Sequence, residues 1–168
     1  MVEKKPDKVI CLGDFADMPS LSSYDQGKRS FEGRRYRDDV EASHEAMAAF
    51  LTPLWEFNEK ARRNKEKQYH PELILTLGNH ENRINRAVND SAQLEGVLSV
   101  DDLGYESYGW DVHPFLDVVV VDGIAYSHYF TTGLMGRPVT TAAACLAKKH
   151  MSCCQGHQQG LQIHSAYK

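Results

Sequence analysis

The stretch LILTLGNHE at residues 73–81 is the strongest structural signal in the chain. Its first five residues are apolar or β-branched, and the run stops at Gly78. A short apolar run that ends at glycine is typical of a buried strand. Asn79 and His80 follow at once, and both can bind metal or move a proton. Because ligands of open α/β sheets bind beyond the carboxyl ends of strands, the stretch predicts a functional edge there.

Three further predicted strands end in the same way, each with a metal-competent side chain just past its carboxyl end. These side chains are Asp14 after the strand at residues 9–12, His128 after the strand at 124–127, and His157 after the strand at 151–155. Glycine precedes Asp14, Asn79 and His157, which lets the backbone turn sharply and approach a ligand closely. Each element alone is weak, because Gly-Asp turns and single histidines are common. Their combination on four strand ends predicts one shared site.

The remaining pattern places helices and loops between these strands. The segment 14–37, rich in Ser, Gly, Asp and Arg, is expected to be a long loop. From Asp38 apolar residues recur every three or four positions, which predicts a helix that Pro53 kinks. The other predicted elements are a short helix at 84–88, an irregular stretch at 89–109, a hairpin of 116–121 and 124–127 around Asp122-Gly123, and an alanine-rich helix at 140–150.

Composition restricts the class of protein. The chain has 168 residues, enough for one domain, with 42% hydrophobic and 25% charged residues, as in soluble globular proteins. A formal charge of −4 gives no global electrostatic case for nucleic-acid binding. The four cysteines show no CxxC spacing, and the first residues contain no apolar leader. We therefore expect a soluble, cytoplasmic protein with no membrane partner.

The order GDFAD at 13–17, GNHE at 78–81, SH at 127–128 and GH at 156–157 resembles the motif series of calcineurin-like metallophosphoesterases. The flanking sequences are similar to bacteriophage and bacterial members, and the resemblance covers nearly the whole chain. It implies an α/β fold of the αββα sandwich type, with two packed mixed β-sheets flanked by helices. The expected domain is a single one over residues 1–168, partial at both ends.

The resemblance also implies a site that hydrolyses phosphate esters with two divalent metal ions. For the metals, the resemblance implies Asp14 as the carboxylate that bridges both ions, and Asn79, His128 and His157 as further ligands of the second ion. For catalysis, it implies His80 as the acid that protonates the leaving oxygen. Asp17 is implied as the carboxylate that orients His80 and favours its charged form. Such a donor set suits Mn, Fe or Zn. Two such ions can neutralise the phosphate charge and activate water.

Several arginines are candidates for binding the substrate. Arg83 and Arg137, and with them Arg86, could hold a phosphate, because the guanidinium fork matches its geometry; a solvated surface is the alternative. Arginines at 29–37 alternate with aromatic residues and could grip a nucleic-acid strand. An ordinary exposed loop is the favoured interpretation of that segment.

The chain departs from the family pattern at the first metal. The family motif Asp-x-His is missing before Gly13, and Gln159 stands where the family has a second histidine after Gly-His. The DVH triplet at 111–113 has the right letters but falls in the wrong order. All three missing ligands belong to one metal, so one ion is an alternative to two. A sheet that lacks strands also leaves open edges, which favour homo-oligomers.

Three interpretations stay open from sequence alone. The first is a phosphate-ester hydrolase, acting on monoesters or diesters, with nucleic acid among the candidate substrates. The second is a metal-binding module without catalysis. The third is an inactive piece of a larger phosphoesterase. Metal stoichiometry together with hydrolytic activity separates them.

Overall fold

The computed structural model describes residues 1–133 and 135–166. Within these residues the protein is mixed α/β, with two three-stranded sheets, a two-stranded ribbon and three α-helices. The predicted α/β class is therefore confirmed at this level. The finer prediction, the specific metallophosphoesterase sandwich, stays a prediction. No helix in the described part of the chain is long and apolar enough to cross a bilayer.

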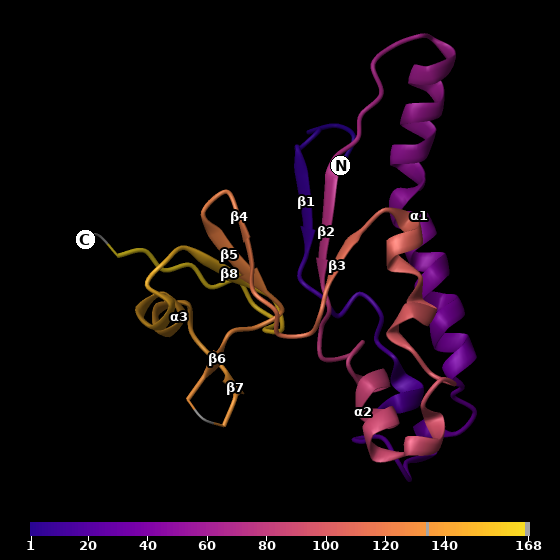
Figure 1. The fold of residues 1–168 in the computed structure, drawn as a ribbon, viewed down its shortest axis with the longest axis vertical. Helices are drawn as coiled ribbons and strands as arrows, with labels where there is room; N and C mark the ends of the chain where they lie inside the picture. The colour runs from indigo at the N-terminus through magenta and orange to yellow at the C-terminus, as the bar shows by residue number, and fades with distance from the viewer. Residues whose placement is uncertain (134, 167–168) are drawn as a thin grey trace.

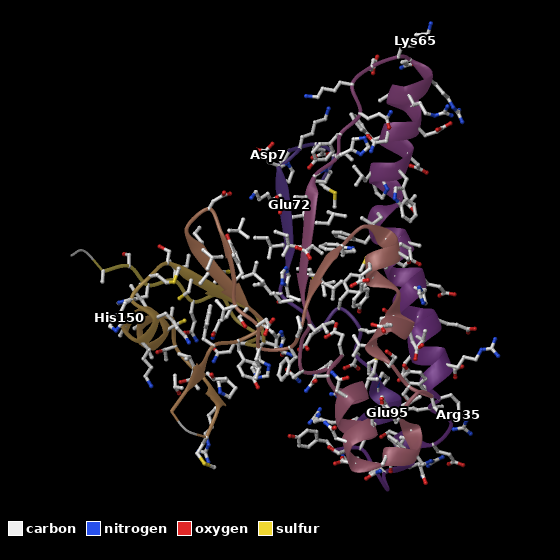
Figure 2. All side chains as sticks on the ribbon, viewed as in Figure 1. Asp7, Arg35, Lys65, Glu72, Glu95 and His150 are labelled. Atoms are coloured by element: carbon white, nitrogen blue, oxygen red, sulfur yellow. The ribbon has the colours of Figure 1, made fainter. Side chains whose placement is uncertain are left out.

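The first sheet is entirely parallel, with the strand order β1-β2-β3. Its strands are β1 (Lys8–Cys11), β2 (Glu72–Thr76) and β3 (Asp111–His113). β1 and β2 confirm two predicted strands to within a residue. β3 was not predicted, because a three-residue strand has no periodicity and forms only through its pairing with β2. Figure 2 shows Asp7 and Glu72 side by side where the first two strands begin, as the parallel arrangement requires.

The long helix α1 (Tyr36–Arg63) spans most of the molecule. Figure 2 shows Arg35, just before it, and Lys65, just after it, at opposite ends of the long axis. The helix begins two residues before the predicted start and continues through Pro53, whose side chain is exposed. The two short 3-10 turns that precede it, Pro19–Leu21 and Arg29–Phe31, lie within the predicted loop.

One face of α1 forms the main core. Met47 and Leu51 are fully buried and belong to the same apolar cluster as Leu75 of β2 and Ile84 of the short helix α2 (Arg83–Asp90). This is the face that the spacing of apolar residues predicted. The stretch between α2 and β3 was expected to be irregular, and it contains three short 3-10 helices, at Ala92–Leu94, Val100–Leu103 and Tyr105–Tyr108.

The second sheet is mixed, with the order β4-β5-β8. Its strands are β4 (Val119–Val121), β5 (Ile124–Ser127) and β8 (Cys153–Gln155). The antiparallel β4-β5 pair confirms the predicted hairpin, but its first arm begins at Val119 and not at residue 116, where Leu116 has φ of 74°. β8 pairs with β5 in parallel. A small ribbon of β6 (Thr131–Thr132) and β7 (Arg137–Pro138) was not predicted.

The helix α3 (Ala142–Lys149) covers the second sheet and confirms the predicted alanine-rich helix. Thr141 caps it by accepting a hydrogen bond from Ala144 N at 3.2 Å. Its buried Cys145 packs in a second, smaller core, separate from the first, with Ala125, Phe130 and Val139. Figure 1 shows the second sheet and α3 on one side of β1-β2-β3 and α1 on the other.

Candidate metal centre

The carboxyl ends of four strands meet where the two sheets approach each other (Figure 1). β1 and β2 are parallel neighbours in the first sheet, and β5 and β8 are parallel neighbours in the second. Each pair therefore delivers its two strand ends to the same edge. The residues that follow these ends are Asp14, Asn79, His128 and His157, named below the four-ligand cluster.

The four-ligand cluster is compact. Asn79 Oδ1 lies 2.7 Å from His157 Nδ1 and 2.9 Å from His128 Nε2. The two histidine nitrogens are 3.3 Å apart, and Asp14 Oδ2 is 3.4 Å from His128 Nε2. The structure thus brings together all four ligands that the sequence predicted for one metal.

The hydrogen bonding of His128 fixes which of its nitrogens faces the cluster as a ligand. Its Nδ1 lies 2.6 Å from the carbonyl oxygen of Leu12, so this nitrogen carries the proton and donates it. Nε2 of the same ring then faces Asn79 Oδ1 and Asp14 Oδ2. A backbone carbonyl that holds the far nitrogen of an imidazole in this way is typical of metal-binding histidines.

The spacing of the inward-facing atoms suits a cation. Ligands bound at about 2.1 Å from a metal are separated by about 3.0–3.4 Å when they lie at right angles or at tetrahedral angles. Most separations in the cluster fall close to this range. The ligand atoms of Asp14, His128 and His157 all lie within 4.8 Å of one another, close enough for one ion to be held by all three.

Two members of the four-ligand cluster have left-handed backbone conformations. Asp14 has φ of 53° and His157 has φ of 66°, a region that costs energy for residues other than glycine. Strain of this kind is typical of functional sites. Burial, and to a lesser degree the neighbouring His128, lowers the pKa of His157, which favours the neutral imidazole that binds metal.

Glu81 is a buried positioning residue, and the sequence alone indicated no role for it. Its side chain is fully buried and accepts hydrogen bonds from the backbone nitrogens of Asp14 (3.0 Å), Phe15 (2.7 Å), Ala16 (3.0 Å) and Gly78 (2.9 Å). The carboxylate therefore joins the loop after β1 to the loop after β2. In this way Glu81 fixes Asp14 beside Asn79 without belonging to the cluster.

His80 lies beside the cluster with Asp17 behind it. His80 Nδ1 is 2.5 Å from Asp17 Oδ1, and His80 Nε2 is 3.9 Å from Asp14 Oδ2. The backbone nitrogen of His80 also donates to Asp14 Oδ1 at 3.0 Å. The imidazole is 30% exposed, so its Nε2 side is reachable from solvent. The two residues are placed as the sequence analysis expected, and their chemical roles stay predictions.

The predicted substrate arginines occupy different surroundings. Arg83 is largely covered and donates to the carbonyl oxygens of Asp17 (2.8 Å) and Met18 (3.3 Å), which supports a positioning role for this side chain. Arg86 is exposed and donates to the carbonyl of Asn79 at 3.4 Å, next to the cluster. Arg137 is exposed on β7, and the described contacts do not join it to the cluster. Substrate binding by any of them stays a prediction.

The basic loop before α1 is partly engaged in internal contacts. Arg34 pairs with Asp25 at 2.9 Å and donates to the carbonyl of Pro19 at 3.2 Å. Tyr36 donates to Asp102 at 2.7 Å. These contacts support the interpretation of an ordinary surface loop.

Among the described residues, the group of carboxylate and imidazole side chains close enough to share one ion contains Asp14, His128 and His157, and not Asp111 or His113. His113 Nε2 and Asp111 Oδ2 lie 3.2 Å apart on β3 and contact each other. Gln159 is exposed in the turn after His157. The described site therefore supplies the ligands of one ion.

The close approach of Gly13 and Gly78 gives a test of how tightly the two loops are joined. Gly13 has φ of 80°, and a Cβ added there would lie 2.4 Å from Gly78 N. Gly13→Ala is therefore expected to lower the free energy of unfolding by about 2–4 kcal/mol, from left-handed strain plus the clash. Gly27 is the matched control, because its φ is 79° and a Cβ there meets nothing within 4 Å.

Urea denaturation of both variants separates the two contributions. Gly27→Ala reports the cost of the left-handed backbone alone, and the additional loss in Gly13→Ala reports the contact with Gly78. Equal losses in the two variants would show that the loops do not touch as described.

Comparison with known protein families, curated proteins and solved structures finds no match for this chain. The functional conclusions below therefore rest on the geometry of the site and on the motif resemblance.

Proposed function

We propose that the chain is a metal-dependent hydrolase of phosphate esters, of the calcineurin-like metallophosphoesterase type. The observation that carries the proposal is the convergence of the four-ligand cluster beside the His80–Asp17 pair. The cluster offers one carboxylate, one amide oxygen and two imidazoles, a donor set suited to Mn, Fe or Zn. Two sheets with flanking helices on either side are compatible with the sandwich fold of that family.

A divalent ion bound there would neutralise phosphate charge and lower the pKa of a bound water. The protein's own residues supply the rest of the chemistry. Asp17 accepts the Nδ1 proton of His80 and so leaves the Nε2 side of the ring free to face a substrate. A protonated His80 can then donate from Nε2 to the leaving oxygen, as a general acid. Arg83 holds the backbone of Asp17 and thereby the orientation of this pair.

The test of the proposal is the leaving-group dependence of His80→Ala. On phenyl phosphate esters, whose leaving group needs a proton, we expect a loss of about 10²–10⁴ in kcat/KM. On p-nitrophenyl esters the loss should be much smaller, because p-nitrophenolate leaves unprotonated. Metal binding should persist in the variant, since His80 lies outside the cluster. The measurements are initial rates with added Mn or Zn and metal content by elemental analysis.

His70→Ala is the matched control, because His70 is an exposed histidine remote from the described contacts of the cluster. It should keep the activity of the unchanged protein on both esters. Equal losses on the two esters in His80→Ala would contradict the general-acid role. Absence of any metal-dependent turnover in the unchanged protein would contradict the hydrolase.

A metal-binding module without catalysis is the second candidate. It is favoured by one observation, the presence of ligands for a single ion in the described site, with Gln159 exposed and with Asp111 and His113 paired to each other. This candidate predicts about one ion per chain and no turnover of either ester. Two ions per chain with turnover would exclude it.

A further inference from the structure

A pair of thiols lies at the contact between α3 and β8, outside the four-ligand cluster. Cys145 Sγ and Cys153 Sγ are 3.0 Å apart, and both cysteines are free. A disulfide bond requires about 2.05 Å between the sulfurs, so closure needs a movement of about 1 Å. Two further cysteines provide internal controls, because Cys11 lies in the other sheet and Cys154 is exposed.

The surroundings of the pair combine a protected sulfur with a reachable one. Cys145 is 4% exposed and belongs to the core beneath the second sheet, whereas Cys153 is partly exposed. Both line a cleft of about 610 Å³, together with Cys154, Tyr126, Leu146 and Leu161. A small molecule that enters this cleft therefore reaches Cys153 before the more deeply buried Cys145.

We propose that Cys145 and Cys153 form a reversible disulfide, a modification site that responds to low-molecular-weight disulfides such as oxidised glutathione. The thiolate of Cys153 attacks one sulfur of oxidised glutathione, whose S–S bond breaks and releases one glutathione. The Cys145 thiol then loses its proton and attacks the Cys153 sulfur of the mixed disulfide, which releases the second glutathione. The protein loses two electrons and two protons, and one oxidised glutathione becomes two reduced ones.

The chemistry of the buried partner fits the second step. Burial, and then the hydrogen bond with Cys153, raises the pKa of Cys145 to about 12, so this sulfur is protonated and inert to external reagents at neutral pH. It reacts only with a sulfur already placed beside it. The order of attack therefore follows from exposure and protonation together.

The position of β8 gives the modification a structural consequence. Cys153 begins β8, and the same strand leads through Gly156 to His157, with Gly156 N donating to the carbonyl of His128 at 3.0 Å. A bond from Cys153 to α3 would therefore fix the strand that presents one metal ligand. This coupling rests on the cluster geometry and does not require catalysis.

The experiment is incubation of the full chain with oxidised glutathione at pH 8, followed by peptide mass mapping. We expect the Cys145–Cys153 cross-link in the unchanged protein and in Cys154→Ser and Cys11→Ser. In Cys145→Ser the reaction should stop with glutathione attached to Cys153. The melting temperature of the oxidised protein should rise by about 5–10 °C, because the cross-link restricts the unfolded chain, and dithiothreitol should reverse the rise.

Two outcomes would overturn the proposal. One is an unmodified Cys145 in folded protein whose exposed Cys154 has reacted fully. The other is a cross-link that forms only between chains or only after denaturation. Because neither readout uses ester hydrolysis, failure of the hydrolase proposal leaves this test unaffected.

Discussion

Replacement of Glu81 with alanine is expected to lower the free energy of unfolding by about 3–5 kcal/mol. The reason is the loss of one carboxylate that satisfies four backbone donors, those of Asp14, Phe15, Ala16 and Gly78. A buried donor left without a partner costs about 1–3 kcal/mol, and entry of water into the vacated space offsets part of the sum. Because a domain is stable by only about 5–15 kcal/mol, this single change removes a large share.

Urea denaturation in the presence of EDTA measures the effect without any contribution from metal binding. Glu106→Ala is the matched control, since Glu106 is exposed on a 3-10 helix and its removal should change stability by less than about 0.5 kcal/mol. Glu81→Gln keeps one acceptor oxygen but turns an NH₂ group toward backbone N–H groups. Its loss of unfolding free energy should therefore lie between those of Glu106→Ala and Glu81→Ala. If Glu81→Ala lowers the free energy of unfolding no more than Glu106→Ala does, the hydrogen bonds from Glu81 to the four backbone nitrogens do not form.

Removal of divalent metal is expected to have the second large effect. At a metal concentration one hundred times the dissociation constant, binding to the folded state stabilises it by about 2.7 kcal/mol. For a chain of this size this corresponds to about 5–10 °C in melting temperature. EDTA should remove the whole increment, because the four-ligand cluster is an assembly of groups far apart in sequence and does not exist in the unfolded chain.

The rise in melting temperature on metal binding should vanish in His157→Ala and in His128→Ala. His128 is buried and contacts Leu12, so its variant also loses stability without metal, whereas His157 is more exposed. The quantity to compare is therefore the difference in melting temperature between added Zn or Mn and EDTA, measured for each variant. His70→Ala should keep the full difference. Retention of the difference in both cluster variants would place the metal elsewhere.

The sequence was sufficient to predict the strands and site residues that have a local pattern of apolar residues and turns. β2 carries an apolar run that ends at glycine, and β5 carries one that follows a hairpin turn. The residues after these strands, Asn79 and His128, could be predicted without knowing their partners. The same holds for Asp14 and His157. Parallel pairing brings together the ends of β1 and β2, and separately those of β5 and β8. That the two pairs meet at one site followed from the motif resemblance and not from the strand pattern.

The sequence was insufficient where the structure depends on distant partners. β3 exists because Asp111–His113 pairs with β2, and three residues carry no periodicity of their own. Glu81 is separated by 65–67 residues from three of its four backbone partners, so no local pattern indicates its role. Arg83 was predicted to bind a phosphate or to lie on a solvated surface, yet its Nη1 donates to two carbonyls of a loop 65–66 residues earlier.

The separation of the two apolar cores has a thermodynamic consequence. Asp14 and Asn79 extend from the half built on α1, and His128 and His157 extend from the half built on α3. An ion bound by all four residues would cross-link the two halves of the protein, whose buried apolar cores are otherwise separate. The halves would then melt as one unit with the ion in place and as two units without it, so free metal concentration would tune the cooperativity of the whole chain.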